Sequence, residues 1–470
     1  MMRRRYHLGI SLFSVLPMLA LLALKAMAQE APVEVAIGVV VEAPPAPTID
    51  TGDNAWMMTS SALVLAMTIP GLALFYGGMT RAKNVGNTIW MNWIAFCITS
   101  MMWVLWSYSL AFAPSNGFIG GLQWAVLGAG RADPADYVGQ LPSTLYATTI
   151  PHLTFCMFQL TFAAITLALV TGAIVERLKF VSWLLFALLW MTGCYPVIAH
   201  WVWATDGWLY KFGALDFAGG TVVHIQSGAA ALVFCLFLGR RKSVKPPHNV
   251  PFTMIGAALL WFGWFGFNAG SAVAANGLAA SAWAVTNTAT ATAAFTWNIM
   301  EWIFDRKPTL IGTCSGAVAG LVAITPASGF VAVMPSLAIG AGAGFLCYSC
   351  VKWMKKALGY DDALDVVGIH AMGGSFGALA TGLFASTLVN PAGADGLFYG
   401  NPALMLKQFV GVLCAWGYAC ACTAVLILFI KGVTKGIRVP EAEEVAGMDI
   451  SQHREVAYHF IEPETNSIRS

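Results

Sequence analysis

Charged residues are scarce in this 470-residue sequence: Asp, Glu, Lys and Arg make up 10% of it, whereas hydrophobic residues make up 58%. An ordinary soluble domain carries roughly 25% charged residues. This shortage of charge excludes a soluble enzyme, and the high apolar content excludes an intrinsically disordered chain. A net charge of +2 also lacks the basic excess that is typical of nucleic-acid-binding proteins. The composition therefore predicts a polytopic membrane protein that lies in a lipid bilayer.

Motifs for ATP-driven or metal chemistry are missing as well. The sequence contains neither GxxxxGKS nor GxxxxGKT, so ATP-driven pumping has no support. The ten cysteines are scattered, and the CxxC pair Cys347 and Cys350 lies in an apolar stretch without a second ligand pair. No arrangement of a nucleophile and a base predicts an enzyme. We therefore expect no cofactor, no metal site and no catalytic residue.

Nine long stretches of the sequence contain no charged residue at all. A helix needs about 20 apolar residues to cross the hydrocarbon core of a bilayer. The stretches Lys245–Glu301 and Lys307–Lys352 are long enough for two spans each, divided near Gly277 and near Pro326, and the other seven stretches provide one span each. This pattern predicts an all-α fold with eleven transmembrane helices within residues 53–433.

The N-terminus has the features of a secretory signal peptide. Arg3, Arg4 and Arg5 precede the apolar run Leu8–Leu24, and Ala26-Met27-Ala28 offers a cleavage site. We expect residues 1–28 to be this signal peptide, with an uncleaved anchor as the alternative. Residues 29–52 are rich in Pro, Ala and Val and predict an extended periplasmic linker.

Two arguments predict the same orientation in the cell inner membrane. Cleavage of a signal peptide places the N-terminus in the periplasm, and eleven spans then place the C-terminus in the cytoplasm. The loops that would be cytoplasmic carry thirteen Lys and Arg, whereas the opposite loops carry Arg131, Lys211 and the neighbouring Lys407. This asymmetry follows the positive-inside rule.

Two histidines lie inside predicted spans, where polar residues are costly and usually functional. Asp216 stands where an N-cap of span five belongs, and His224 follows about 12 Å deeper at 1.5 Å per residue. Asp365 and His370 open span ten from the opposite side. Spans five and ten correspond if the helices form an inverted repeat of two five-helix halves, 1–5 and 6–10, followed by a long helix 11. Packing in the core is the alternative role for each histidine, but the correspondence favours a functional pair near the membrane midplane.

Aromatic residues gather near the predicted outer end of the same region. Trp264, Phe267 and Ser271 have the i, i+3, i+7 spacing of one helix face. Phe162 lies in span three, and Trp203 ends span four on the outer side. Aromatic residues in membrane helices usually serve packing or the interfacial belt. Together with a hydroxyl group above two histidines, they indicate a cation site of the cation–π type.

At this point the sequence closely resembles the ammonium transporter (Amt) family of the Amt/Rh superfamily, from Asp53 to Tyr458. The motifs that carry the resemblance are Met67–Gly78, Gly172–Arg177, Gly213–Ile225, Gly263–Ser271 and Asp365–His370. The resemblance implies a homotrimer of eleven-helix protomers, each with its own pore.

The resemblance also implies roles for the outer aromatic residues. Trp203, Phe162 and Ser271 match the site that recruits ammonium, or its analogue methylammonium. Asp216 matches the carboxylate that orders this site without touching the ion. Phe162 and Phe267 match the stacked pair that closes the outer mouth, and a tryptophan at Trp203 favours the Amt branch over the Rh branch.

His224 and His370 match the twin histidines of the family's pore, and Trp264 matches a pore-lining aromatic residue. The family usually has His-Gly-x-Gly-Gly at the second histidine, whereas Ala371 replaces the first of those glycines here.

Simple energetics favour one mechanism. Burying an ammonium ion in an apolar pore costs at least several kcal/mol, whereas removing its proton at neutral pH costs about 3 kcal/mol. Neutral ammonia then crosses for nitrogen uptake, the imidazoles relay the proton, and potassium is rejected. A membrane ammonium sensor or docking platform with little flux, and a channel for a neutral gas such as carbon dioxide, are the alternatives.

The C-terminal residues 434–470 follow the last predicted span, and a solvated charged terminus is one interpretation of them. Residues 435–458 resemble the family's C-terminal tail, with Arg454 in the place of a glycine. The resemblance implies a cytoplasmic regulatory tail that packs under the neighbouring protomer. It also implies that the tail couples the three pores and helps to dock a PII-type nitrogen regulatory protein.

Overall fold

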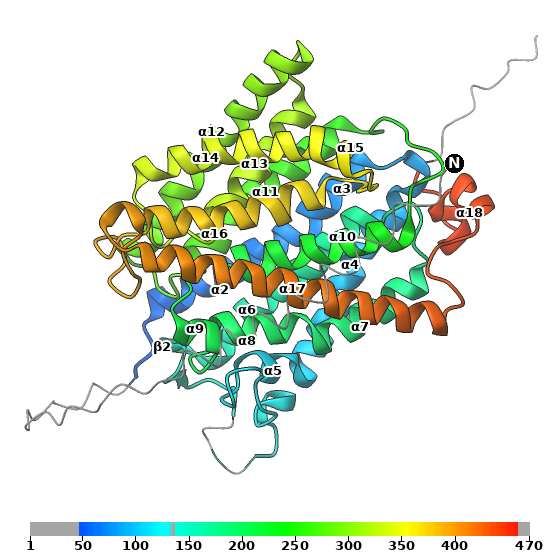
Figure 1. Ribbon diagram of the computed structural model, residues 1–470. Coiled ribbons are helices and arrows are strands. Elements are labelled where there is room, and N and C mark those ends of the chain that lie inside the picture. The colour runs from blue at the N-terminus through cyan, green and yellow to red at the C-terminus, as the bar shows by residue number, and fades with distance from the viewer. Residues whose placement is uncertain (1–46, 132, 134–136, 459–470) are drawn as a thin grey trace, which may run out of the picture. The chain divides into compact units, whose positions relative to one another are not determined.

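The computed structural model describes residues 47–131, 133 and 137–458. The predicted signal peptide 1–28 and most of the linker 29–52 lie outside the described residues, so both stay predictions. Helices that run side by side dominate the described part of the chain (Figure 1). A small two-stranded antiparallel sheet, β1 (Pro142–Ser143) and β2 (Ala147–Pro151), leads into the helix that follows it.

Nine helical segments within the described residues are long and apolar enough to cross a membrane. This finding confirms the prediction of a helical, multi-pass membrane protein. The segments are Thr51–Met79, Ala82–Phe112, His152–Ile174, Phe180–Phe212, Gly220–Leu238, Val250–Gly270, Val333–Leu358, Val367–Phe384 and Pro402–Val433.

Two further helices occupy the places where the sequence predicts spans seven and eight. Helix α12 (Gly277–Asp305) begins at the glycine near which the first long stretch divides. Helix α13 (Leu310–Ile324) ends just before Pro326, near which the second long stretch divides, and has only 15 residues. α12 is rich in Ala and Thr, which lowers its hydropathy without introducing charge.

Several spans are interrupted rather than continuous. The first consists of α2 (Thr51–Ala66), the π-helical turn η1 (Met67–Leu72) with Pro70 inside it, and α3 (Ala73–Met79). The second consists of η2 (Ala82–Asn84), α4 (Val85–Met102), η3 (Trp103–Ser107) and α5 (Tyr108–Phe112). The fourth breaks into α7 (Phe180–Gly193), α8 (Tyr195–Trp203) and α9 (Trp208–Phe212). The segment at predicted span nine consists of α14 (Val333–Ser349), η7 (Cys350–Met354) and α15 (Lys355–Leu358).

The spans that carry the two histidines each begin with a π-helical turn. η6 (Gly220–Ile225) opens the fifth span and continues as α10 (Gln226–Leu238). η8 (Val367–Ala371) opens the segment at predicted span ten and continues as α16 (Met372–Phe384). This segment starts three residues after Leu364, the start expected from the sequence. π-Helical turns are rare and are frequent at functional sites.

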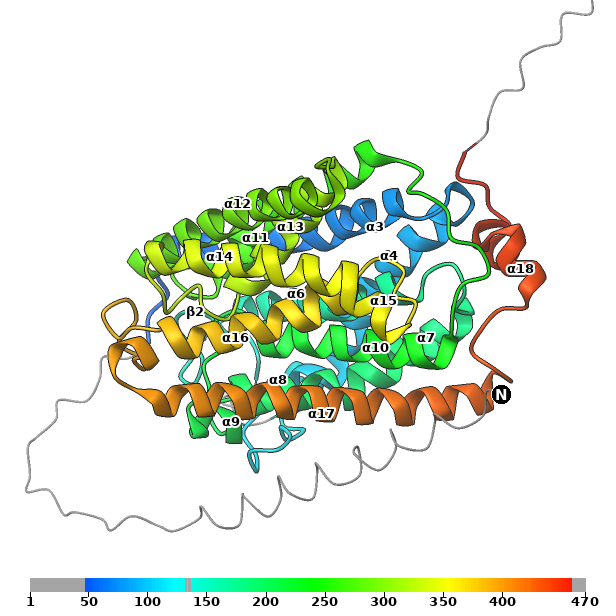
Figure 2. The same ribbon diagram turned by 45° about the horizontal axis from the view of Figure 1, so that its top comes forward.

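The remaining long helices pack around these two spans. α6 (His152–Ile174) contacts α10, and α11 (Val250–Gly270) lies along α2 and α3. α12, α13 and α14 form a layer of their own, whereas α17 (Pro402–Val433) extends along α10 and α16 (Figure 2). The C-terminal residues form α18 (Glu441–Ala446) and the turn η10 (Asp449–His453), which contacts the start of α4.

Candidate functional site

Two histidines from opposite halves of the chain meet inside the bundle. The Nδ1 atoms of His224 and His370 lie 3.2 Å apart, and the two ring centroids are separated by 5.3 Å. Both rings are buried. A hydrogen bond between two imidazole nitrogens requires that one donates and the other accepts, so one proton lies between the rings. The structure thus brings together the two residues that the sequence pairs.

Aromatic rings lie on one side of this histidine pair, the side that the sequence predicts to face outward. The ring of Trp264 stacks on His224 with centroids 5.3 Å apart, and the ring of Phe267 lies 6.2 Å from the same histidine. Nε2 of His224 makes no hydrogen bond to any other described residue. This nitrogen is therefore free to exchange a hydrogen bond with a small polar molecule that reaches it.

The orientation of Trp264 depends on residues that the sequence analysis did not single out. Its indole Nε1–H donates to Oγ1 of Thr325 over 2.8 Å. The Thr325 hydroxyl donates to the carbonyl oxygen of Leu321 over 2.7 Å and lies 3.3 Å from Oδ1 of Asn268. Asn268 in turn donates to Oγ1 of Thr286. Asn268 follows Phe267 directly within a motif that the sequence analysis quotes, but nothing in the sequence pairs it with Thr325.

A second group of rings continues the line outward. Phe162 and Phe267 stack with their centroids 4.0 Å apart and their planes within 15° of parallel, and both rings are buried. The half-buried Trp203 contacts Phe162 edge to face at 5.8 Å. The Ser271 hydroxyl donates to the carbonyl oxygen of Phe267 over 2.9 Å, so this hydroxyl bonds within its own helix. Trp203, Phe162, Phe267 and the histidines form one continuous line of rings.

Asp216 joins the outer rings to the start of the span that carries His224. Its carboxylate accepts four backbone N–H groups, those of Gly219, Gly220, Thr221 and Val222, at 2.7 to 3.0 Å. Its carbonyl oxygen accepts the indole N–H of Trp203 over 2.9 Å. Burial raises the pKa of Asp216, and the four amide donors act against that rise. The N-cap of the π-helical turn is Gly219, three residues after Asp216, but the Asp216 carboxylate still accepts from the first-turn amides as predicted.

The two histidine spans touch where Ala371 replaces the glycine expected from the motif. A side chain added at Gly228 of α10 would lie 2.4 Å from the backbone nitrogen of Ala371, too close for any real contact. Only glycine at position 228 allows this approach, because any Cβ would push the π-helical turn of His370 away. The methyl group of Ala371 is itself fully buried against this glycine.

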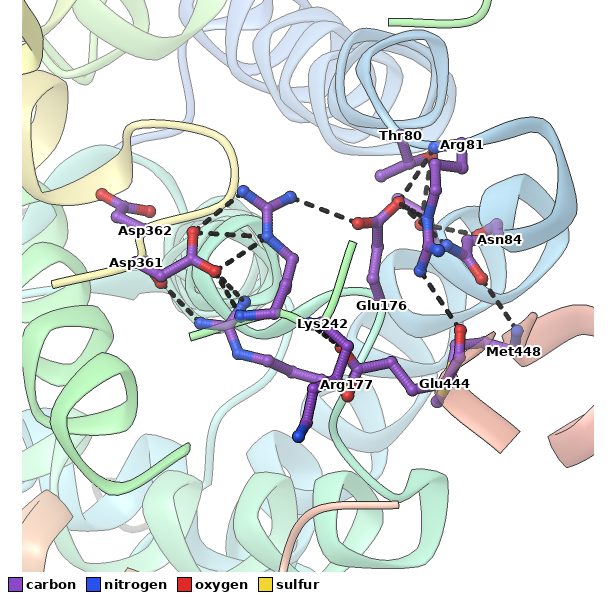
Figure 3. A network of polar contacts seen from close by, with 12 residues as sticks. Thr80, Arg81, Asn84, Glu176, Arg177, Lys242, Asp361, Asp362, Glu444 and Met448 are labelled. Carbon is purple, nitrogen blue, oxygen red and sulfur yellow. Dashed lines mark hydrogen bonds and ion pairs between the residues drawn. The ribbon is translucent and has the colours of Figure 1, made fainter. Parts of the chain in front are cut away.

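Buried and half-buried charged side chains form a network of polar contacts among the loops between the spans (Figure 3). Glu176 accepts hydrogen bonds from the backbone N and the Nε of Arg81, both at 3.0 Å, and from Asn84 at 2.8 Å. Arg241 bridges Glu176 at 3.2 Å and Asp361 at 2.9 Å. Burial tends to raise the pKa of both carboxyl groups. The backbone N–H of Arg81 and the neighbouring guanidinium groups outweigh this effect at Glu176. The guanidinium groups of Arg241 and Arg177 outweigh it at Asp361. The pKa of Glu176 is therefore lowered, and that of Asp361 falls to about 2.

The C-terminal tail attaches to this network. The Glu444 carboxylate accepts from Arg438 at 2.6 Å and from the backbone nitrogen of Lys242 at 2.6 Å. Asp449 accepts the backbone N–H groups at the start of α4, at 2.7 and 3.0 Å. Arg454, which replaces a glycine of the tail motif, keeps the left-handed backbone conformation that glycine favours, with φ at 56°. In the sequence the basic residues of these loops indicate only the membrane orientation, and nothing there predicts that they pair in this network.

The fold and the site define a polytopic helical membrane protein with a line of aromatic rings that ends on a buried histidine pair. The model of the Ammonium Transporter Family matches residues 55–458. The chain belongs to this family.

Individual relatives agree with the family match. The chain is 49% identical over 409 residues to an ammonium transporter of Bacillus subtilis, covering 87% of this chain and 98% of that protein. The crystal structure of Saccharomyces cerevisiae Mep2 is similar with a TM-score of 0.77 at 34% identity, covering 84% of this chain and 89% of Mep2. A structure titled "Sensor Amt Protein" is similar with a TM-score of 0.76 at 26% identity, covering 86% of this chain and 98% of that chain. The expectation that the protein is not an enzyme is confirmed, since its relatives are transporters.

Proposed function

We propose that the protein transports ammonium into the cell: it recruits the ion at the outer aromatic site, removes its proton and conducts neutral ammonia past His224 and His370. The observation that carries this proposal is the continuous line of rings from Trp203 to the paired histidines, in a chain of this family. The electron-rich faces of Trp203 and Phe162 attract a cation, and the Ser271 hydroxyl adds a polar group beside them.

The stacked rings of Phe162 and Phe267 close the outer mouth as a gate. At a centroid distance of 4.0 Å these rings leave no room for an ion between them, so a substrate passes only when they rotate. A desolvated ion in this apolar section costs several kcal/mol, and loss of its proton at neutral pH costs about 3 kcal/mol. Deprotonation is therefore the cheaper route, and potassium has no proton to lose.

The histidine pair then serves both ammonia and the proton. Nε2 of His224 offers a hydrogen-bond partner to neutral ammonia, and Trp264 holds the imidazole face. The Nδ1 contact of 3.2 Å between the two histidines gives the proton a route from one ring to the other. Transport of ammonia and relay of the proton together make the process electrogenic.

The membrane topology that we propose has eleven spans, with α12 and α13 as spans seven and eight. Helices 1–5 and 6–10 form an inverted repeat, helix 11 is α17, and the chain enters the inner membrane with its N-terminus in the periplasm and its C-terminus in the cytoplasm. The pairing of His224 and His370 from π-helical turns of spans five and ten supports this repeat.

We further propose that three protomers assemble into a homotrimer. Large apolar side chains on one flank of the second span are exposed in the single chain and fit a lipid or protomer contact, as Trp90, Trp93, Met101 and Leu105 show. The tail residues 434–470 form the regulatory segment, which docks a PII-type protein when cellular nitrogen is plentiful. The ion pairs that join Glu444 to loops below the pore support this regulation.

An ammonium sensor with little flux is the second candidate, since the fold also resembles a protein titled "Sensor Amt Protein". Purified protein reconstituted in liposomes separates the two. A transporter gives a sustained current on an ammonium pulse and no current on an equal potassium pulse. Ammonium binding without current would support the sensor, and a carbon dioxide flux without ammonium current would support the gas channel.

A further inference from the structure

A histidine and a carboxylate lie directly behind the outer aromatic site and have no role in the transport mechanism described above. His200 is fully buried on α8, one turn before Trp203, and Asp206 lies in the loop that follows this helix. Nε2 of His200 and Oδ1 of Asp206 are 3.6 Å apart. α8 contacts both α5 and α9, and the three short helices lie near one another in Figure 1.

The hydrogen bond on the other side of the ring fixes the tautomer of His200. Nδ1 lies 3.0 Å from the carbonyl oxygen of Ala111. A carbonyl oxygen only accepts, so Nδ1 carries the hydrogen. In a neutral imidazole Nε2 is then a bare acceptor, and it faces the acceptor oxygen of Asp206.

One proton can lie between Nε2 of His200 and Oδ1 of Asp206. Neither Nε2 of His200 nor Oδ1 of Asp206 makes a hydrogen bond to any other residue in the described ranges. Two buried acceptors that face each other are unfavourable, whereas a proton between them converts the contact into a charge-assisted hydrogen bond. The second carboxylate oxygen is already occupied, because Oδ2 accepts the backbone N–H of Ser115 over 2.5 Å.

The pair is built into the backbone that carries Trp203. The carbonyl oxygen of His200 accepts the N–H of Ala204, which closes the helix directly after Trp203. A side chain added at Gly207 would lie 2.0 Å from the same carbonyl oxygen, so the loop containing Asp206 packs tightly on the last turn. From the other side, Asp216 holds the Trp203 indole. A shift of the loop therefore moves the recruiting ring.

Other titratable groups on the neighbouring elements do not occupy this contact. Tyr146 donates its hydroxyl to the carbonyl oxygen of Phe112. The other titratable groups on α8 and on the elements packed against it are Tyr195 on α8, Tyr108 on α5, Lys211 on α9, His224 on η6, and Lys407, Cys414, Tyr418, Cys420, Cys422 and Lys431 on α17. Tyr108 bonds to His152 and Tyr418 to the carbonyl oxygen of Gly193.

We propose that His200 and Asp206 hold one proton between them and that this pair positions Trp203 for cation recruitment. The inference rests on the proposed function, because it assigns a supporting role at the same outer site. His200 and Asp206 are positioning residues, since they act through the helix end and the loop and not on the ion itself. The site takes a proton from the outer medium, so recruitment weakens when that proton is lost.

Asp206→Asn is the sharpest test. The amide has the shape of the carboxylate, and its N–H donates to neutral Nε2 without a shared proton. We expect the apparent affinity of the wild type for methylammonium to weaken by about fivefold from about pH 4.5 to about pH 8, a range that includes the ordinary titration of an imidazole and extends below it. A fivefold change corresponds to the loss of about one hydrogen bond. The affinity of Asp206→Asn should stay constant over the same range.

Two further variants complete the design. His200→Asn keeps a donor for the Ala111 carbonyl and removes Nε2, so its affinity should be weak at every pH. Asp395→Asn changes a carboxylate that binds Thr387 in a different loop and should retain the pH profile of the wild type. Equal pH profiles for the wild type and Asp206→Asn would overturn the proposal.

A second readout does not depend on transport. The shared proton stabilises the folded state, so the unfolding temperature of the detergent-solubilised wild type should fall, relative to Asp206→Asn, as pH rises. This difference appears even if the protein carries no ammonium, in which case the proton site stands and the transport proposal fails. A constant difference between the two unfolding temperatures at all pH values would show that no proton is shared.

Discussion

Two ring contacts set the properties of the proposed pathway at the scale of single residues. The stacked pair Phe162 and Phe267 lies at a centroid distance of 4.0 Å, and the histidine pair lies at 3.2 Å between its Nδ1 atoms. In the mechanism that we propose, the first contact excludes a hydrated ion from the pore, and the second lets a proton pass between the two histidine rings. An apolar side chain in place of either histidine removes the contact between the two imidazoles and leaves the stacked rings of Phe162 and Phe267 in place.

Replacement of either pore histidine tests that contact. We expect His224→Leu and His370→Leu each to abolish or sharply reduce the ammonium current, because the proton route is lost while an assembled trimer remains. The double variant should also lose selectivity and pass other cations. His152→Leu is the matched control, since it removes a buried histidine that bonds to Tyr108, away from the line of rings. Wild-type currents and selectivity in both pore variants would return the histidines to a packing role.

Replacement of Trp203 tests recruitment. Trp203→Leu should weaken the apparent affinity for ammonium by roughly 1–2 kcal/mol, the value of a partly desolvated cation–π contact. Trp201→Leu is the matched control, because Trp201 is two residues away but bonds to the backbone of Phe118. Competition between ammonium and methylammonium measures both. An unchanged affinity in Trp203→Leu would remove the outer site from the mechanism.

At the scale of helices and loops, the sequence predicts much of the fold but not its interruptions. The charge-free stretches locate the long apolar helices because a bilayer tolerates few charges, and Gly277 and Pro326 lie at breaks between helices. The π-helical turns that carry His224 and His370 are not visible in any periodicity of the sequence, and neither is the close contact of Gly228 with Ala371. The two pore histidines can be predicted from the sequence, because a polar side chain inside a membrane is costly and usually functional.

The roles of residues that act through a partner distant in the sequence cannot be predicted from the sequence. Thr325 holds Trp264 through one hydrogen bond, and a threonine in an apolar helix carries no signal of its own. The pairing of Arg241 with Glu176 and Asp361 likewise depends on three loops that meet only in the folded chain.

The tail provides a prediction at this scale. Truncation after Lys435 removes the partners of Lys242, Arg81 and the start of α4, so we expect an assembled protein with impaired transport. Glu444→Gln is a milder companion that weakens the ion pair with Arg438 and leaves the chain complete. Liposome currents measure transport, and binding assays with a cognate PII protein under different nucleotide conditions measure docking. Full transport by the truncated form, with no PII binding by the intact protein, would show the tail to be inert.

At the scale of the whole molecule, the fold places charge at the two ends of the spans and rings between them. The buried network of Glu176, Arg241 and Asp361 lies at one end, and the Asp216 cap lies at the other. Between them the pathway offers aromatic rings and imidazoles, which suit a small neutral molecule with hydrogen-bonding capacity and not a bare ion. We therefore propose that the ammonium ion loses its proton at the outer mouth and that ammonia and the proton then move separately.

The ammonium current of wild-type liposomes in light and heavy water tests this separation most directly. If a proton leaves the ion and moves through the histidine pair, the current falls in heavy water by clearly more than the rise in solvent viscosity explains. His370→Leu liposomes give the background. A current that falls only in proportion to viscosity would mean that the ammonium ion crosses intact, and it would contradict the mechanism.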